Sequence, residues 1–391
     1  MPFDINKITG FLRKTGVKNF ILQLGVIIIL ALFLHWVIDN TVANLAQLQI
    51  ASGFGFLNMR AGISIPDSLI PYNEDSTYRV ALLAGLVNTI FMSVLCIVAA
   101  SFLGLVIAFG RLSHNWLLQK LCLAYVEIFR NLPPLLVILF WYFGILQQIL
   151  PPVRQSFVLP FSIYINQRGI YFPAMHWQGG WFLPLAVIFA GIFSSVAITF
   201  IVHKRKYFSN RGQHVLSVSF LWLILLLSAM FWLFGSYGQF DNPQLQTFNI
   251  AGGASISPEF LALFLALSFY TAALVSETVR AGMEGVDAGL KEAGAALGLH
   301  SGQVTRFVTL PLALRIIIPP LASQYMNLVK NTSLAVAIGY SDLMRIGNTV
   351  LNQTNQSIEV VVIWMAAYLG LSLVVSVFMN WFNFRAALVE R

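Results

Sequence analysis

Long apolar stretches recur along the whole chain, separated by shorter polar segments. Each stretch is long enough to cross a hydrocarbon core of about 30 Å as a helix. The strict alternation of an outer-membrane β-barrel is absent, so the pattern predicts helices. The predicted spans cover residues 19–38, 80–110, 124–148, 181–203, 214–236, 257–279, 313–338 and 358–382.

The composition agrees with this pattern. Of the 391 residues, 58% are hydrophobic and 10% are charged. Soluble domains carry about a quarter charged residues. We therefore predict an all-α integral membrane protein with about eight transmembrane helices. The first span is expected to be retained, because no small-residue cleavage site follows it and many spans come after it.

Basic residues are distributed unequally between the two sides of the membrane. With eight spans, 17 of the 23 Lys and Arg residues fall on or near the side of the membrane that carries the amino terminus, residues 203–214 and residues 280–312. Cytoplasmic loops carry an excess of Lys and Arg, so both termini and residues 280–312 are predicted to be cytoplasmic. Residues 39–78 and 151–180 are then outward loops. The net charge of +8 is a topology signal and does not indicate a nucleic-acid partner.

Residues for catalysis, metal binding or nucleotide binding are not arranged in recognisable motifs. The two cysteines, Cys96 and Cys122, lie within or beside apolar segments, and the six histidines are scattered. No His-Glu-x-x-His pattern and no phosphate-binding Gly-x-x-x-x-Gly-Lys-Ser/Thr loop occurs. We expect no catalytic residue, metal or cofactor on this chain. If ATP drives the system, another chain binds it together with Mg²⁺.

A polar, glycine-punctuated segment lies between the sixth and seventh spans and reads GLKEAGAALGLHSGQVTRFVTLP. Its pattern predicts a helix–turn–helix at the membrane surface. One helical stripe contains the apolar residues Val286, Leu290, Ala293 and Leu297. Asp287 and Lys291 are spaced as an i,i+4 ion pair on another face.

Three residues of this segment predict where its helices begin and end. Gly298 stands where a helix C-terminus favours a positive φ. Ser301 is the expected N-cap of the second helix. Pro311 is expected to end that helix or to redirect it into the bilayer.

The same segment resembles the EAA loop of permease subunits in binding-protein-dependent ABC importers. That signature reads Glu-Ala-Ala, three residues, Gly, nine residues, Ile, any residue, Leu-Pro. Five residues stand at matching positions: Glu292, Ala293, Gly298, Leu310 and Pro311. Gly294 replaces the third small residue and Val308 replaces the isoleucine. The resemblance implies that this EAA-type loop, residues 280–312, couples the permease to an ATPase.

Placing one charged residue within a span costs about 2.5–3.5 kcal/mol. Charged residues within spans or at their ends are therefore informative. Glu127 and Arg130 form one i,i+3 pair, and Glu277 and Arg280 form another. Each pair is expected to neutralise itself at a helix end. The alternative is that some of these side chains line a substrate pathway.

A second polar patch follows the Pro-Pro pair of the seventh span. It contains Lys330, Asn331, Thr332 and Ser333. A proline-interrupted helix with a cation and hydrogen-bonding neighbours is typical of a cavity wall. An amino acid is a zwitterion, so Lys330 and its neighbours, with Glu277 as an acid, are the hypothetical substrate pathway.

Three stretches resemble the polar amino-acid branch of the importer permeases: YVEIFRNLPPLL, SETVRAGMEGV and LVKNTSL. The long form of the chain, with ASGFGFL after the first span, is similar to the general L-amino-acid permeases. The resemblance implies a type I importer core of five helices within residues 80–390. Residues 1–79 would add a span and an outward loop, and residues 151–256 would be an insertion carrying two further spans.

The resemblance implies a multi-pass permease subunit of the bacterial inner membrane that imports L-amino acids and is not itself an enzyme. Its implied partners are ATP-binding subunits, a second permease subunit that is related but different, a periplasmic amino-acid-binding protein and membrane lipid. Two other classes remain open on the residues alone. They are a secondary amino-acid transporter and a membrane-embedded enzyme or scaffold.

Overall fold

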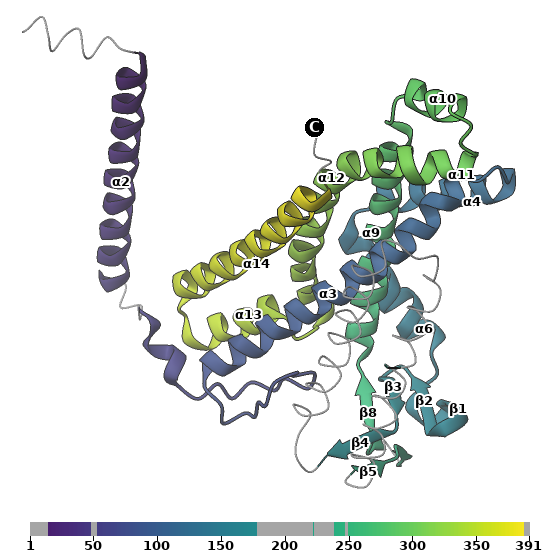
Figure 1. Cartoon of the computed structure of the whole chain (residues 1–391). Coiled ribbons are helices and arrows are strands. Elements are labelled where there is room, and N and C mark those ends of the chain that lie inside the picture. The colour runs from purple at the N-terminus through teal and green to yellow at the C-terminus, as the bar shows by residue number, and fades with distance from the viewer. Residues whose placement is uncertain (1–14, 48–52, 178–221, 223–237, 247–248, 387–391) are drawn as a thin grey trace, which may run out of the picture. The chain divides into compact units, whose positions relative to one another are not determined.

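Figure 1 shows the computed structural model of the chain, which describes residues 15–47, 53–177, 222, 238–246 and 249–386. Contacts between residues divide the chain into two compact units. Unit 1 comprises Met1–Asn131 and Leu267–Arg391, and unit 2 comprises Leu132–Ala266. Helix α9 (Pro258–Glu284) begins in unit 2 and continues into unit 1.

Unit 1 is helical throughout its described part, apart from connecting loops. Its helices before α9 are α2 (Thr15–Gln47), η1 (Phe54–Asn58), α3 (Tyr78–Arg111) and α4 (Trp116–Asn131). After α9 come α10 (Ala288–Ala296), α11 (Ser301–Val304), η5 (Thr305–Thr309), α12 (Leu310–Asn331), η6 (Thr332–Ile338), α13 (Leu343–Thr354) and α14 (Ser357–Ala386).

Five described helical segments have the length and hydropathy of membrane spans. They are Leu22–Thr41, Tyr78–Arg111, Pro258–Glu284, Ser301–Ile338 and Ser357–Arg385. They confirm the spans predicted at 19–38, 80–110, 257–279, 313–338 and 358–382. The spans predicted at 181–203 and 214–236 lie outside the described residues, apart from Trp222.

The span predicted at 124–148 is not one continuous helix. Helix α4 ends at Asn131, and α5 (Pro134–Leu139) begins after a break, so the two helices qualify as a span only as a bent pair. Two consecutive prolines cause this break. Neither Pro133 nor Pro134 has an N–H to donate, and the residue before a proline is driven out of the helical region. Beyond α5 the chain continues as the π-helical segment η2 (Phe140–Leu146) and α6 (Gln147–Ile149).

Unit 2 contains short β-strands that the all-α expectation did not include. They are β1 (Phe157–Leu159), β2 (Ile163–Asn166), β3 (Gly169–Phe172), β4 (Ala174–Trp177), β5 (Gly238–Asp241), β6 (Gln244–Leu245), β7 (Ile250–Ala251) and β8 (Ala254–Ile256). Two short helical turns, η3 (Val153–Gln155) and η4 (Pro160–Ser162), precede β1 and β2.

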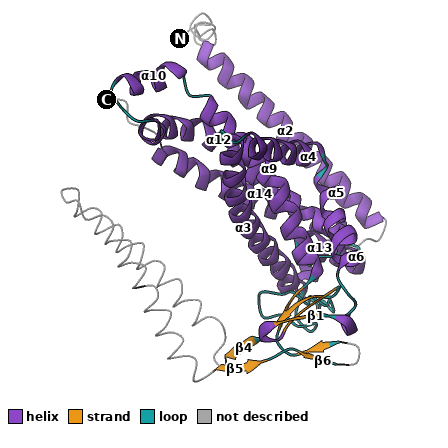
Figure 2. Ribbon diagram, turned by 90° about the vertical axis from the view of Figure 1, so that its right-hand side faces the viewer, coloured by secondary structure: helices purple, strands orange, loops and turns teal. Residues whose placement is uncertain are grey.

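Four strands form an antiparallel sheet in the order β1-β2-β3-β8. Strands β4 and β5 form a separate pair, drawn side by side in Figure 2, and β6 pairs with β7. Ile170 of β3 lies opposite Ile256 of β8. Gly169 opens β3 at φ +128°, and a Cβ there would lie 2.2 Å from the Ile256 carbonyl oxygen. Residues 151–177, the described part of the expected outward loop, thus contribute three strands to a sheet whose fourth strand, β8, comes from the other end of unit 2.

Helices α3 and α9 approach each other closely in unit 1. A Cβ on Gly104 would lie 2.6 Å from Cγ1 of Val275 and 3.0 Å from the carbonyl oxygen of Ala272. Helix α12 approaches α9 in the same way, because a Cβ on Gly282 would lie 2.2 Å from Cγ1 of Ile317. Small residues therefore set the spacing of these helices, as in other membrane helix pairs.

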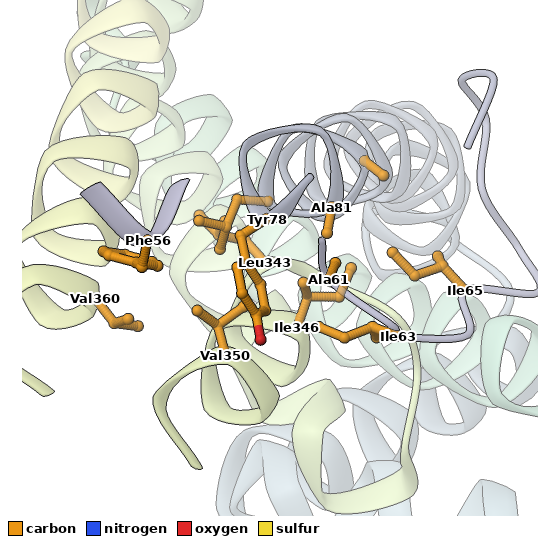
Figure 3. Close-up of a cluster of buried hydrophobic side chains, with 12 residues drawn as sticks. Phe56, Ala61, Ile63, Ile65, Tyr78, Ala81, Leu343, Ile346, Val350 and Val360 are labelled. Atoms are coloured by element: carbon orange, nitrogen blue, oxygen red, sulfur yellow. The ribbon is translucent and has the colours of Figure 1, made fainter. Parts of the chain in front are cut away.

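The loop that precedes α3 is folded onto unit 1. Figure 3 shows Ala61, Ile63 and Ile65 directed into a buried cluster with Leu343 and Ile346 of α13. Alternate residues of this extended segment point the same way, which is the period of an extended chain. The Gly53 N–H also donates to Oε1 of Glu359 at 2.5 Å. This part of the expected outward loop is thus an integral piece of the core.

Hydrogen bonds and ion pairs establish which ends of the helices lie together. Near the start of α3, Asn88 donates to the Ser341 carbonyl oxygen at 2.9 Å, and Leu343 N–H donates to Thr89 Oγ1 at 3.1 Å. At the other end of α3, Arg111 is paired with Glu277 of α9. The EAA-type loop follows α9 and therefore lies at the Arg111 end of unit 1, away from the loop that precedes α3.

We predict that Gly104→Ala destabilises unit 1 because the added methyl group meets the branched Val275 side chain and a backbone oxygen. Overpacking of this kind costs about 1–3 kcal/mol. The measurement is the thermal unfolding midpoint of the purified protein in detergent, which we expect to fall.

The matched control is Gly370→Ala in α14, where a Cβ would meet nothing within 4 Å. That replacement should leave the midpoint unchanged or raise it, because alanine is the better helix former. Equal midpoints for the two variants would contradict the close approach of α3 and α9.

Candidate functional site

The EAA-type loop begins with a well-defined helix start. Asp287 is the N-cap of α10, and its side chain accepts a hydrogen bond from the Gly289 N–H at 2.9 Å. The Lys291 ammonium donates to the Met283 carbonyl oxygen at 3.4 Å. The i,i+4 pair expected between Asp287 and Lys291 is therefore not formed, because capping the free N–H groups of α10 occupies the carboxylate.

The end of α10 is a Schellman motif. Gly298 has φ +81°, which confirms the predicted positive φ at this residue. Its N–H donates to the Ala295 carbonyl oxygen at 2.9 Å, and the Leu299 N–H donates to the Gly294 carbonyl oxygen at 3.3 Å. These two bonds satisfy carbonyl groups that the helix end would leave free, and they turn the chain sharply.

The second helix of the loop departs from the expected N-cap and excludes one of the two roles expected of Pro311. Its N-cap is His300 and not Ser301, with Oε1 of Gln303 accepting from the His300 N–H at 3.0 Å. Pro311 does not end the helix, because residues Ser301–Ile338 form one helical segment of 38 residues. The π-helical turn η5 lies immediately before Pro311 and widens the helix where the proline lacks an N–H.

The loop has one buried face and one exposed face. Gly294, one of the two residues that depart from the usual EAA signature, is buried, and a Cβ on it would lie 3.3 Å from Cγ2 of Val304. Leu290, Leu297 and Phe307 are exposed, and Leu297 is 83% exposed. The apolar stripe predicted on α10 thus points away from its own chain after Val286. Large apolar side chains exposed along one short segment are a feature of many protein interfaces.

The five residues that match the EAA signature do not converge on one point. Glu292 and Ala293 are exposed on α10, Gly298 forms the turn, and Leu310 and Pro311 lie in the first turn of α12. The five residues are spread over a surface, and the Glu292 carboxylate is the single ionisable group among them. This geometry suits docking better than chemistry.

A charged cluster lies beside this loop at the end of α9. Glu277 accepts hydrogen bonds from Arg280 Nη2 at 2.7 Å and from Arg280 Nε at 3.3 Å, which confirms the predicted pair. Glu277 also pairs with Arg111 of α3, whose side chain is only 8% exposed. Arg280 pairs in addition with Glu284.

The expected pair between Glu127 and Arg130 is not formed among the described residues. Arg130 instead approaches Glu277, with Nη1 of Arg130 at 3.8 Å from Oε2 of Glu277. Sequence analysis missed Arg111 because nothing in the spacing along the chain relates it to Glu277. Its position at the end of a predicted span was the only available signal.

The residues of the hypothetical substrate pathway are separated. Glu277 belongs to the arginine cluster, near the level where Ile317 of α12 packs on Gly282. Lys330 comes 13 residues after Ile317, roughly 20 Å further along the helix. Lys330 is exposed, and Thr332 is fully buried with its hydroxyl donating to the Val329 carbonyl oxygen at 2.7 Å.

Asn331 and Ser333 are partly exposed beside Lys330, and the Ser333 hydroxyl donates to the Lys330 carbonyl oxygen at 2.7 Å. The structure therefore keeps the four consecutive residues 330–333 together at the end of α12. It does not bring Glu277 to them.

A buried polar junction near the start of α3 was not predicted. Asp342 is the N-cap of α13, and its Oδ1 accepts from the Arg345 N–H at 2.8 Å. Burial raises the pKa of the Asp342 carboxyl to about 7, against the opposing effect of N–H groups that bond to it. Asn88 and Thr89 face the same junction. A polar dipeptide just after a span was too weak a signal to reveal this contact.

The described part of the chain holds no group of three or more His, Cys, Asp or Glu side chains placed to bind a metal ion. The arrangement of charges and surfaces instead suits the binding of other molecules.

Comparison with known proteins identifies the family. Residues 205–387 match the family model described as a binding-protein-dependent transport system inner membrane component. The chain is 49% identical over 374 residues to the general L-amino acid transport system permease protein AapQ of Rhizobium johnstonii, covering 96% of this chain and 93% of the relative.

Two further relatives span nearly the whole chain. The putative amino-acid ABC transporter permease protein YhdX of Escherichia coli is 44% identical, with 96% of this chain and 95% of the relative covered. The glutamate/glutamine/aspartate/asparagine transport system permease protein BztB of Rhodobacter capsulatus is 35% identical, with 98% and 97% covered. The chain therefore belongs to the permease family of binding-protein-dependent ABC transport systems.

Proposed function

We propose that this chain is the permease subunit of an ATP-driven importer of L-amino acids that receives its substrate from a periplasmic binding protein. The proposal rests on relatives that are similar over nearly the whole chain and are named amino-acid permeases. It also rests on an EAA-type loop built as a docking surface. Family membership gives no support to a secondary transporter or to a membrane-embedded enzyme.

The observation that carries the coupling role is the exposed apolar face of the loop. Leu290, Leu297 and Phe307 are exposed although unit 1 buries Gly294 and Val304 on the other side of the loop. We propose that this face inserts into a groove of an ATP-binding subunit, which binds ATP and Mg²⁺. Glu292 and Ala293 lie on the exposed surface of the same helix.

The loop is joined to the membrane domain by a continuous helix. Because α11, η5, α12 and η6 form one segment from Ser301 to Ile338, a displacement of the loop is carried along the helix toward α13. Closure of the ATPase subunits would move the loop as a unit and rock the spans between inward-open and outward-open states. A second, related permease chain would form the other part of the pathway.

Charge and the grouping of helix ends support one orientation. The Arg111 end of unit 1 carries the EAA-type loop, and the excess of Lys and Arg on that side supports a cytoplasmic position for it. Trp364 near the start of α14 donates to the Leu343 carbonyl oxygen at 3.1 Å, so α14 runs toward the EAA-type loop end. We propose that both termini are cytoplasmic.

Residues 330–333 are the proposed contact with substrate. Lys330 has no ion-pair partner in the described part of the chain, so its ammonium group is available to a carboxylate. Asn331 and Ser333 offer neutral hydrogen bonds beside it. Glu277 is held by arginines, so we do not propose it as the partner of a substrate ammonium group.

We predict that Gly298→Val uncouples the permease from its ATPase. A β-branched residue at φ +81° costs about 1–2 kcal/mol and opens the Schellman turn. ATP turnover stimulated by the loaded binding protein should fall in reconstituted vesicles. Gly298→Asn is the control, because asparagine tolerates a positive φ, and it should retain most of the stimulation. Full stimulation in the valine variant would argue against coupling through this turn.

The docking face is tested separately with Leu297→Ser. Because Leu297 is 83% exposed, the change removes little internal packing, and the permease should remain folded. We expect the ATPase subunit to copurify poorly with this variant. Leu69→Ser, at a residue 50% exposed in the loop preceding α3, should copurify normally. Equal recovery of the ATPase with both variants would count against the proposed docking face.

The proposed orientation is tested with single cysteines at Gln303 and Asn73 in a variant lacking Cys96 and Cys122. An impermeant thiol reagent added to intact spheroplasts should label Asn73→Cys and leave Gln303→Cys unlabelled until the membrane is opened. The reverse pattern would overturn the orientation.

We predict that Lys330→Met lowers transport of all amino acids alike by roughly tenfold, because a hydrogen bond from a charged donor contributes about 1.5–3 kcal/mol. The measurement is uptake in vesicles, with basal ATP hydrolysis and expression as checks on folding. Lys330→Arg keeps the charge and should retain part of the uptake. Normal uptake by the methionine variant would place the substrate pathway elsewhere.

A further inference from the structure

A small cavity lies in unit 1 beside the arginine cluster. Its volume is about 230 Å³, and its lining comprises Arg111, Gln119, Lys120, Leu123, Arg280 and Glu284. Sites for whole small molecules usually have about 300–1,000 Å³. This cavity therefore suits a small polar group better than a complete metabolite.

The charges around the cavity do not balance. Four cations lie in or next to it: Arg111, Lys120, Arg130 and Arg280. Two carboxylates, Glu277 and Glu284, lie among them and pair with Arg111 and Arg280. Arg130 is only 3.8 Å from Glu277, and Lys120 has no ion-pair partner in the part of the chain that the structure describes. This net positive charge favours the binding of an anion.

The cavity lies at the level of the membrane–water interface. Arg111 directly follows the span predicted at 80–110, and Arg280 directly follows the span predicted at 257–279. Both helices end near these residues, since α3 ends at Arg111 and α9 at Glu284. This is the depth at which lipid phosphate groups lie, outside the hydrocarbon core.

The side of α4 next to the cavity is apolar and exposed. Trp116 precedes Lys120 by one helical turn and is 68% exposed. Leu117 and Leu121 form the adjacent i,i+4 row and are also exposed. A tryptophan and an apolar row beside a cationic cavity match the amphipathic chemistry of a lipid, because tryptophan is enriched at membrane interfaces.

We propose that this cavity binds the phosphate group of an anionic phospholipid, with Lys120 as its direct contact and the acyl chains along Leu117 and Leu121. Arg111 and Arg280 supply the positive field, while their carboxylate partners keep them in place. Basic pockets between helices at the membrane surface bind lipid headgroups through the same interaction. The bound lipid would contact α3, α4 and α9 at once and stabilise their packing beside the EAA-type loop.

Two other polar ligands share part of this chemistry. A free phosphate ion would use the cations but would gain nothing from the apolar row. A zwitterionic amino acid would not neutralise the surplus charge. The test of this site does not depend on the proposed transport activity, because it measures bound lipid and not amino-acid uptake.

The test is native mass spectrometry of the complete transporter, purified in mild detergent and titrated with phosphatidylglycerol. Lys120→Gln should weaken lipid retention roughly fivefold, the effect of removing one lysine near an anionic lipid surface. Lys120→Arg should restore most of the retention. Lys120 lies outside the buried ion pairs, so these variants should fold normally, which size-exclusion chromatography checks.

Arg385→Gln is the matched control. It removes one positive charge from the last turn of α14, where Arg385 stacks 5.3 Å from the Trp381 ring, and it does not line the cavity. Lipid retention should be unchanged. An equal loss in both variants, or equal retention of phosphatidylcholine and phosphatidylglycerol, would overturn a specific lipid site. Displacement of the lipid by inorganic phosphate or by free L-amino acids would also overturn it, and would assign the cavity to a soluble anion or to substrate.

Discussion

The close approach of α3, α9 and α12 is the constraint on which the rest of unit 1 depends. Lipid gives helices little hydrophobic reason to associate, so packing between small residues must hold them. Gly104 and Gly282 leave no room for a Cβ against Val275 and Ile317. This contact brings the ends of α3 and α9 together. As a result, Arg111 and Glu277, which are far apart in sequence, form a partly buried ion pair.

That ion pair connects the membrane helices to the EAA-type loop. Glu277 gathers arginines from α3, α4 and α9, and the loop begins directly after α9. A partly buried carboxylate loses some of its water, and cations and hydrogen bonds must replace it. The cluster therefore fixes the end of α9, from which the loop begins. After the loop, one continuous helix runs from Ser301 to Ile338 within unit 1.

Local patterns predicted much of this architecture. The apolar stretches predicted five of the described spans, with bounds close to those observed. Gly298 was expected to adopt a positive φ, because few other residues do so at low cost, and it does. The EAA signature located the loop and led to the family that the relatives confirm. The errors concern competing local effects. Asp287 caps α10 and does not pair with Lys291, and a π-helical turn accommodates Pro311 within a continuous helix. The two prolines after α4 bend the expected span without removing it from the candidates.

The sequence by itself determined the membrane character, the positions of five described spans and the position of the EAA-type loop, because hydropathy and turn chemistry act over a few residues. Only the tertiary structure decided which distant residues meet. It pairs β3 with β8 and packs residues 61–65 against α13. It also pairs Glu277 with Arg111 and keeps Glu277 apart from Lys330. Such contacts depend on how closely the helices pack and on where the chain reverses. The periodicity of apolar residues along the sequence carries no information about either.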